Sequence, residues 1–301
     1  MILEANILSK LQNKAQLARE LGISRGVLYR DHKMPKKDLE IANKIRQVQE
    51  LHPSYGYRRI ALTLKINHKR ALRVMQLFDL KSKRKTKIYK KVEKNLNEDL
   101  NKIEYKNLII NKKITKPNQV WSADFTYLPS DNKNHKFIFL ATVIDCYTRE
   151  ILGFELSVKH DTNLVVNALF DAIKARRNKV PEIFHTDQGS DNFHEKIATD
   201  SKNKINQSYK SKEFVNILQS LKIRSSFSNK ASPWENGRQE SFYQKFKLEL
   251  GDPRNYNDLG DLFAVVSKQV FYYNNERIHT ALKTSPSLFY LKYVHLHNSK
   301  N

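Results

Sequence analysis

The chain has 301 residues, 40% of them hydrophobic, which is enough for the cores of about two domains. Its 54 Lys and Arg outnumber 31 Asp and Glu, giving a net charge of +23, and its single cysteine excludes a disulfide framework or a multi-cysteine zinc module. The N-terminus lacks a signal-peptide pattern, and the longest apolar stretch, residues 137–144, is too short to span a membrane. We therefore expect a cytoplasmic protein with no membrane partner.

The positive charge is concentrated in the N-terminal part of the chain. Residues 1–119 hold 29 Lys and Arg against 11 Asp and Glu, whereas residues 120–301 hold 25 against 20. A solubility effect or a lysine-rich coding bias would spread the excess evenly, and no basic amphipathic helix favours a membrane surface. We expect nucleic acid to be the partner of the N-terminal part.

Residues 1–34 are predicted to form a first helix-turn-helix unit. The segment AQLARELGISRGVLYR (15–30) combines an apolar stripe with Gly22, at the point where two helices would meet in a tight turn. Ser24 can cap the second helix. Arg25, in that second helix, is therefore a candidate DNA contact.

Residues 35–80 are predicted to form a second unit of this kind. Asn67 can cap a helix whose expected apolar face comprises Ala71, Leu72, Met75 and Leu77 or Phe78. The first turns of this helix are basic, and cations there oppose the helix dipole unless an external anion meets them. The candidate DNA contacts of the unit are Arg58, Arg59, Lys69, Arg70 and Arg73. A solvated basic face is the alternative.

Residues 81–116 are predicted to be a basic linker. Within them, residues 81–94 carry eight basic residues and one acid without a clean period, so self-repulsion disfavours a packed element there. Such a segment can follow DNA phosphates.

From residue 117 onward the sequence pattern changes to strands. Residues 120–128 alternate apolar and polar side chains, and strands at 136–147 and 149–157 extend them into an antiparallel meander. The remaining predicted elements are a helix (162–177), a strand (182–187), a helix near 211–221, a strand (223–228) and helices near 233–250 and 257–275. This order predicts an α/β ribonuclease-H-like catalytic core over residues 117–301, with a mixed five-stranded sheet and flanking helices.

Three carboxylates stand out by their predicted positions. Asp124 lies inside a strand, where aspartate is disfavoured, Asp187 ends the fourth strand, and Glu240 lies on the polar face of a helix. They converge if the first and fourth strands are neighbours and the helix packs beside them. Such a cluster requires cations, and two Mg²⁺ or Mn²⁺ ions would suit both the oxygen ligands and a phosphoryl displacement. Taken singly, each carboxylate also fits an ordinary surface or turn residue.

Several motifs are recognisable in the chain. They are HPSYGYRRI (52–60), INHKRALRVM (66–75), KPNQVWSADFTYLP (116–129), HTDQGS (185–190), SPWENGRQESFYQKFK (232–247) and YNNERIHTAL (273–282). Together they resemble the catalytic, second-frame transposases of the insertion sequence three family, in the DDE transposase and retroviral integrase superfamily. The resemblance implies that Asp124, Asp187 and Glu240 are the catalytic and metal-binding triad. It also implies that Lys247 lies near the DNA end, and Asn236, on the same predicted helix face, is a further candidate DNA contact.

The chain departs from the family pattern at three places. The family has a shorter stretch between the second Asp and the Glu, whereas 52 residues separate Asp187 from Glu240 here. Removing residues 191–207, which are polar, would restore the family spacing, so we expect a surface insertion there. The family pattern has a proline where this chain has Ile278 and a glycine where it has Lys283.

The resemblance implies a DNA transposase that binds terminal inverted repeats, nicks at a transposon 3′ end and joins that end to target DNA. It implies a bacterial, nucleoid-associated protein that acts as a homo-multimer on DNA, together with an upstream first-frame protein. Two alternatives stay open. The chain could be a catalytically inactive DNA-binding regulator of the element, or a ribonuclease-H-type nuclease that hydrolyses without joining.

Overall fold

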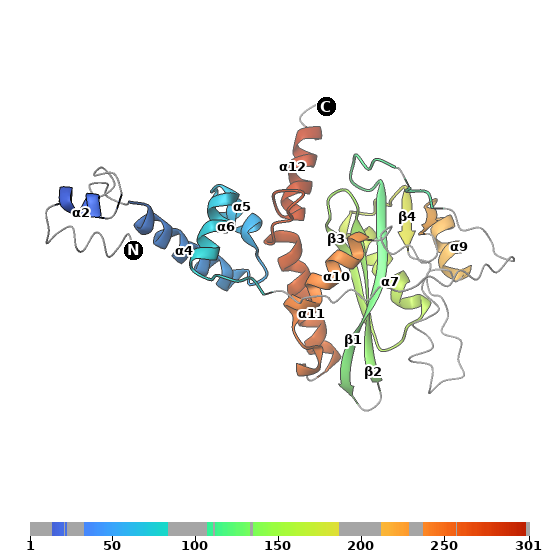
Figure 1. Ribbon diagram of the computed structural model, residues 1–301. Coiled ribbons are helices and arrows are strands. Elements are labelled where there is room, and N and C mark those ends of the chain that lie inside the picture. Colours follow the sequence, from blue (N-terminus) through green and yellow to red (C-terminus); the bar gives the residue numbers. More distant parts are fainter. Residues whose placement is uncertain are drawn as a thin grey trace, which may run out of the picture. The chain divides into compact units, whose positions relative to one another are not determined.

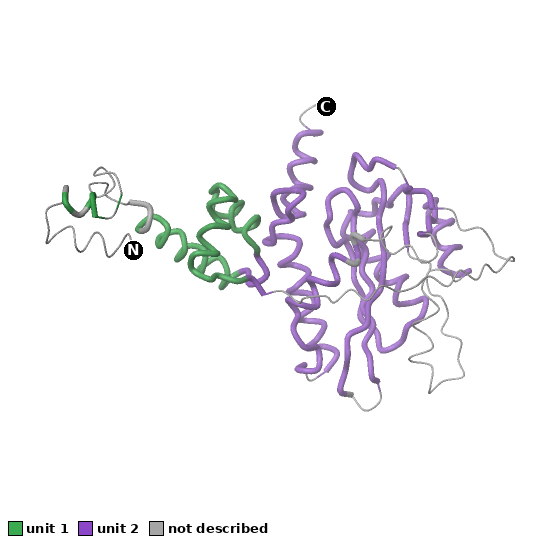
Figure 2. Tube along the Cα trace, in the orientation of Figure 1, with its two compact units in different colours: residues 1–51, 56–81 green, residues 52–55, 82–301 purple. Residues whose placement is uncertain are grey.

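The computed structural model describes residues 14–20, 22, 33–83, 107–110, 112–132, 135–186, 212–228, 237–256 and 258–298. The chain divides into two compact units. Unit 1 comprises residues 1–51 and 56–81, and unit 2 comprises residues 52–55 and 82–301 (Figure 2). Within the described ranges, no helix is both long and apolar enough to cross a membrane.

The described part of unit 1 is helical. Its helices are α2 (Lys14–Glu20), α4 (Lys33–Leu51), α5 (Tyr57–Leu64) and α6 (His68–Leu77) (Figure 1). α5 ends at Lys65, which has a left-handed φ of 52°. α6 begins after Asn67, whose side chain accepts a hydrogen bond from the main-chain nitrogen of Lys69, so the predicted cap is confirmed. Only residues 65–67 separate the two helices.

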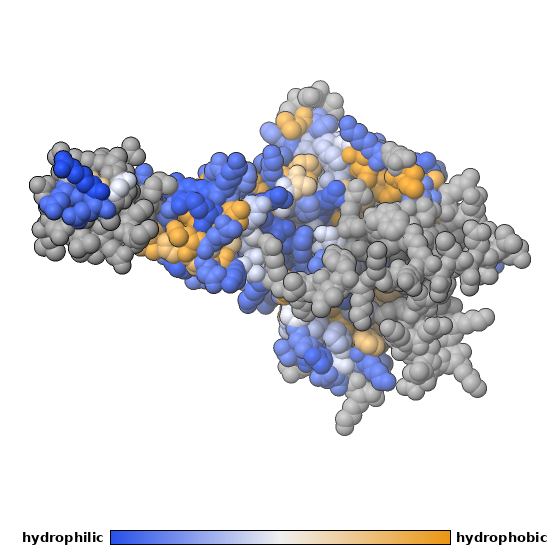
Figure 3. All heavy atoms as spheres, viewed as in Figure 1, coloured by the Kyte–Doolittle hydropathy of each residue, from blue (hydrophilic) through white to orange (hydrophobic). Residues whose placement is uncertain are grey.

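The apolar face of α6 differs in part from the prediction. Ala71 and Met75 are buried as expected, but the third buried residue is Val74. Leu72 and Leu77, which were expected on this face, are 37% and 62% exposed. The reason is the helical period, which aligns positions 71, 74 and 75 and leaves 72 and 77 beside them. Figure 3 shows apolar surface interrupting the otherwise largely hydrophilic visible face of this unit.

Unit 2 contains a mixed five-stranded sheet with the order β3-β2-β1-β4-β5. The strands are β1 (Val120–Asn132), β2 (His135–Asp145), β3 (Ile151–Ser157), β4 (Ile183–Thr186) and β5 (Arg224–Phe227) (Figure 1). β1, β2 and β3 form the predicted antiparallel meander, and β4 pairs in parallel with β1 and β5. The first and fourth strands are therefore neighbours, and the predicted ribonuclease-H-like fold is confirmed.

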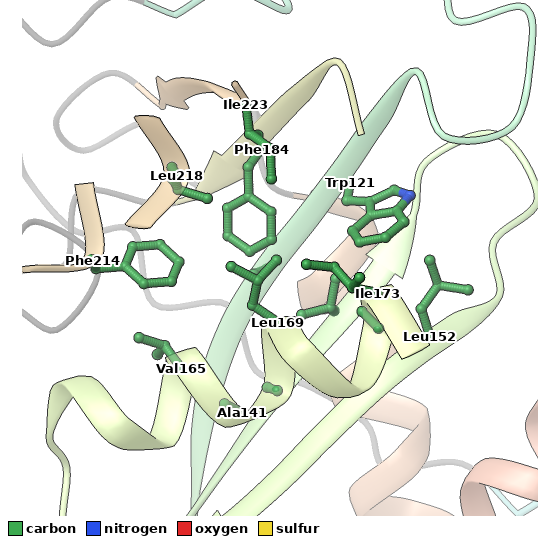
Figure 4. Close-up of a cluster of buried hydrophobic side chains, with 14 of the residues drawn as sticks. Trp121, Ala141, Leu152, Val165, Leu169, Ile173, Phe184, Phe214, Leu218 and Ile223 are labelled. Carbon is green, nitrogen blue, oxygen red and sulfur yellow. The ribbon is translucent and has the colours of Figure 1, made fainter. Parts of the chain in front are cut away.

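One face of the sheet packs against α7 (Thr162–Ala175) and α9 (Lys212–Ser220). Trp121 of β1 and Phe184 of β4 gather there with Leu169 of α7 and Leu218 of α9 (Figure 4). α7 comes very close to β3, because a Cβ atom on Gly153 would lie 2.2 Å from the carbonyl oxygen of Ala168. Only glycine permits this approach.

The other face packs against α10 (Gly237–Leu250) and α11 (Leu259–Asn275). Phe242, Phe246 and Leu250 of α10 are buried in this second core, as their helical spacing predicts. A short 3-10 helix, Pro253–Asn255, lies between α10 and α11 in the sequence. β1 thus contributes to both cores, and its predicted alternation is confirmed by burial of Trp121 in the core with α7 and of Leu128, on the opposite side, in the core with α10 and α11.

Two helices, α4 and α12 (Pro286–Asn298), were not predicted from the sequence. α12 is held by aromatic and charged contacts to the turn after β2 and to the end of α7. The guanidinium carbon of Arg176 lies 3.8 Å from the ring centre of Tyr290, and Arg176 also pairs with Glu150 at 2.8 Å. Phe289 packs against Tyr147. These contacts come from residues distant in sequence, so no local period reveals the helix.

Candidate active site

Asp124 lies in the middle of β1, opposite Thr142 of β2. Its side chain is partly buried, and its Oδ1 atom accepts a 2.8 Å hydrogen bond from the main-chain nitrogen of Phe125. The alternation along β1 assigns Asp124 to the side of the sheet that contacts α10, away from the core between the sheet and α7. A carboxylate is thus held on the central strand rather than on an edge strand.

β4 ends beside the same part of β1. Thr186, its last residue, pairs with Ala123 in a parallel register. Asp187 follows Thr186 directly in the sequence, as Asp124 follows Ala123, but it lies outside the described residues. Because β1 and β4 run in the same direction, the predicted convergence of Asp124 and Asp187 requires Ala123 to pair with Thr186, and this pair is present.

α10 is hydrogen-bonded to the main chain of β1 and β2. Gln239 Nε2 donates to the carbonyl oxygen of Ser122 at 2.6 Å and to that of Thr142 at 3.3 Å. Tyr243 Oη donates to the carbonyl oxygen of Asp124 at 2.7 Å. Glu240 lies in α10 directly after Gln239, although its side chain is outside the described part of the structure.

The predicted metal site has the right kind of donors. Three carboxylates offer hard oxygen ligands, which suit Mg²⁺ or Mn²⁺ and not the softer transition metals. Asp124 is the member of the triad whose side chain the structure describes, and its strand carries the parallel β4 on one side and α10 against its face. Among the other described side chains, no group of three or more His, Cys, Asp or Glu could hold a metal ion.

Lys247 lies two turns after Glu240 on α10. Its ammonium group donates a 2.9 Å hydrogen bond to the carbonyl oxygen of Tyr127 and lies 4.7 Å from the centre of that ring. This contact places a positive charge beside the same strand that carries Asp124. Asn236, the other candidate DNA contact near α10, lies outside the described residues, as does Arg25 of the first predicted unit.

The basic candidates of unit 1 divide into two groups. Arg73 pairs with the buried carboxylate of Asp38 on α4 at 2.7 Å, and Arg70 lies 3.7 Å from the same oxygen. These two side chains therefore have a structural partner within the unit. Lys69 and Arg58 are exposed, and Arg59 is partly buried. Arg58 also lies over the ring of Tyr57, 5.6 Å from its centre.

The far end of α10 contacts residues 52–55, which belong to unit 2. Glu249 accepts a hydrogen bond from the hydroxyl of Ser54 and pairs with the buried Arg277 at 3.1 Å. Its second oxygen accepts from Gln269 at 2.9 Å. α10 is thus fixed to the sheet near Glu240 and to residues 52–55 near its C-terminal end.

Sequence reasoning did not single out Gln239, Tyr243 or Thr142. Gln239 and Thr142 are fully buried and Tyr243 is nearly so, and the three are joined by side-chain hydrogen bonds. The available signal was the spacing of four between Gln239 and Tyr243, which puts two polar groups on the helix face toward the sheet. A buried polar pair at that spacing is unusual in a helix otherwise packed by phenylalanine.

Two protein families, each described as an integrase core domain, match residues 114–233 and 221–286. InsK of insertion sequence element IS150, from Escherichia coli K12, is 26% identical over 277 residues that cover 89% of each chain. The transposase for insertion sequence element IS904, from Lactococcus lactis, is 29% identical over 262 residues, or 83% of this chain and 94% of that protein. The catalytic core domain of HTLV-2 integrase, solved with magnesium in a trimeric form, is 17% identical and covers 58% of this chain and 97% of its own, with a TM-score of 0.39. On the strength of the two integrase core matches and the two transposases, the chain belongs to the insertion-sequence transposases of the DDE transposase and integrase superfamily, as its motifs predict.

Proposed function

We propose that this transposase binds the terminal inverted repeats of its insertion sequence, nicks the DNA at the element's 3′ ends and joins those ends to target DNA. The observation that carries the proposal is the placement of β1, β4 and α10. β1 and β4 pair in parallel up to Ala123 and Thr186, the residues before Asp124 and Asp187. On α10, Gln239, one residue before Glu240, donates to the carbonyl oxygen of Ser122, and Tyr243, three residues after Glu240, donates to that of Asp124. Asp124, Asp187 and Glu240 are the proposed catalytic and metal-binding residues.

The proposed reaction has two phosphoryl displacements. In the first, water attacks the phosphorus at the element's end, and the element's 3′-oxygen leaves and takes up a proton. In the second, this new 3′-hydroxyl attacks a target phosphorus, and the target's own 3′-oxygen leaves. Two Mg²⁺ or Mn²⁺ ions, when bound, would activate the attacking oxygen and stabilise the leaving one. The three carboxylates would hold these ions, and Lys247, on the same helix as Glu240, would neutralise a phosphate of the DNA end.

The remaining parts of the proposal concern binding. Residues 1–34 and 35–80 would contact the terminal repeats, with the exposed side chains of Lys69 and Arg58 as phosphate contacts. Residues 81–116 would be the basic linker, and residues 191–207 a surface insertion in the core. The chain would act as a homo-multimer on DNA with a first-frame protein, in the bacterial cytoplasm at the nucleoid.

The test is a cleavage and joining assay on a labelled duplex that carries the terminal repeat, with Mg²⁺, Mn²⁺ or EDTA. Wild type should give metal-dependent 3′-end nicks and joined products, and Glu240→Gln should give neither. Glu213→Gln, which alters an exposed carboxylate on α9, is the matched control and should behave as wild type. Binding without any chemistry would indicate the regulator, and hydrolysis without joining would indicate a ribonuclease-H-type nuclease.

A further inference from the structure

A small polar network lies buried between α10 and the centre of the sheet. Besides the bonds from Gln239 and Tyr243 to main-chain carbonyls, the hydroxyl of Thr142 donates to Gln239 Oε1 at 3.1 Å. The same hydroxyl oxygen lies 2.8 Å from Tyr243 Oη. Thr142 is also the residue opposite Asp124 in the antiparallel register of β1 and β2. Gln239 and Tyr243 therefore connect α10 both to the side chain of Thr142 and to the main chain of β1.

The packing of α10 against the sheet does not require this network. Phe242, Phe246 and Leu250 already bury apolar surface between α10 and the sheet. Burying an amide and two hydroxyls costs free energy unless each group forms a hydrogen bond. Apolar side chains of similar shape would pack there without this cost. The hydrogen bonds determine the register of α10 against β1, because they can all form in only one register.

Register is the quantity that the proposed chemistry depends on. A slip of one residue along α10 would turn Glu240 by about 100° and shift it by about 1.5 Å. The bonds from Gln239 and Tyr243 reach β1 at Ser122 and at Asp124, and Glu240 lies between these two helix positions. The network therefore fixes the helix at the one turn that carries the proposed third carboxylate.

We propose that Gln239, Thr142 and Tyr243 are positioning residues, which set α10 against β1 so that Glu240 and Asp124 can share metal ions. This inference rests on the proposed function, and it adds a role for three residues that are not among the proposed metal ligands or DNA contacts. It predicts that removing one hydroxyl from the network raises the dissociation constant of the metal while the melting temperature changes little.

The test uses the full-length chain and Mn²⁺ as the probe, with free Mn²⁺ measured by electron paramagnetic resonance. Thr142→Val keeps the shape of the side chain and loses the hydroxyl, whereas Thr142→Ser keeps the hydroxyl and loses a methyl group. Tyr243→Phe removes the second hydroxyl. Tyr256→Phe is its matched control, because the Tyr256 hydroxyl also donates to a main-chain carbonyl, that of Leu250, at 3.0 Å. Circular dichroism and thermal unfolding are recorded for every variant.

We expect Thr142→Val and Tyr243→Phe to raise the Mn²⁺ dissociation constant about tenfold, while Thr142→Ser and Tyr256→Phe stay within about twofold of wild type. The joining reaction should require correspondingly more Mn²⁺. If Thr142→Ser weakens Mn²⁺ binding as much as Thr142→Val, or if every variant lowers the melting temperature and leaves Mn²⁺ binding unchanged, the network is only structural. If wild type and Glu240→Gln bind Mn²⁺ equally weakly, the three-carboxylate site is wrong, and the positioning role is wrong with it.

Discussion

The main-chain N–H of Ile278 donates a 2.7 Å hydrogen bond to the hydroxyl oxygen of Tyr55, although 223 positions separate the two residues. The family pattern that the sequence resembles has a proline at position 278, and proline has no N–H to donate. Tyr55 is fully buried, and its segment, residues 52–55, belongs to unit 2. The departure from the family pattern therefore supplies a bond that helps to hold this segment on the rest of unit 2.

The first prediction tests that bond with a double-mutant cycle. Tyr55→Phe should lower the free energy of unfolding by about 1 kcal/mol, because it removes the acceptor and leaves the ring in place. In an Ile278→Pro background the donor is already gone, so the same change should cost much less. Urea unfolding of the four proteins measures the coupling. Equal costs of Tyr55→Phe in both backgrounds would show that the bond contributes nothing.

The second prediction concerns pH. Burial lowers the pKa of His52 below its ordinary value of about 6.5, and the charge of Arg277 lowers it further, while Glu276 and Glu249 act in the opposite direction. Below pH about 6.5 the unfolded chain therefore binds more protons than the folded chain, and the stability present at higher pH is lost as the pH falls. His52 Nδ1 also forms a 2.8 Å hydrogen bond with Tyr272 Oη.

Urea unfolding at several pH values between 7.5 and 5.5 measures this effect. The free energy of unfolding of wild type should fall more steeply with decreasing pH than that of His52→Gln, which has no titrating ring. Parallel pH profiles for the two proteins would contradict the assignment of His52 as the sensitive group.

The third prediction concerns the turn before α12. Lys283 has a φ of 58°, which lies in the left-handed region that glycine adopts without steric cost, and the family pattern has glycine there. Lys283→Gly should raise the free energy of unfolding by roughly 0.5–1 kcal/mol, the relief of strain less the added entropy of the unfolded chain. Lys283→Ala, which keeps a Cβ atom, should show no such gain. A loss of stability in Lys283→Gly would contradict the account.

The fourth prediction separates two roles on the basic face of α6. Arg73→Met should lower the stability of unit 1 by about 1 kcal/mol, because it takes away the 2.7 Å partner of the buried Asp38. Lys69→Met should leave stability unchanged, weaken binding to the terminal-repeat duplex and lower the slope of log affinity against log salt by about 1. Thermal unfolding and salt-dependent binding of both variants check this. If Arg73→Met leaves stability unchanged, the Arg73–Asp38 pair contributes nothing, and Arg73 belongs to a solvated basic face instead.

The sheet could be predicted from the sequence because β1 carries its alternation locally. Trp121 and Ala123 are buried toward α7 and Asp124 lies on the side of α10, as a period of two requires. α12 could not be predicted from the sequence, because its apolar side chains do not form one stripe. Leu288, Leu291 and Leu296 are exposed, while aromatic contacts to Tyr147 and Arg176 hold the helix.

The candidate site shows a similar division. Acidic residues inside a strand or at its end are conspicuous in the sequence, so Asp124 and Asp187 could be singled out before the structure. Gln239 and Tyr243 are ordinary residues for an exposed helix, and their role depends on main-chain carbonyls 117 and 119 positions away. The same holds for Arg73, whose basic character indicates DNA, whereas its partner Asp38 is 35 positions away and visible only in the fold.

The most direct test of the central claim is to locate Mn²⁺ by anomalous diffraction in crystals of the full chain. We expect two anomalous peaks about 3.5–4 Å apart, bounded by the carboxylates of Asp124, Asp187 and Glu240. Both peaks should vanish in Glu240→Gln crystals, or one should remain with reduced height. Peaks elsewhere, or the three carboxylates held apart with no metal between them at saturating Mn²⁺, would contradict the account.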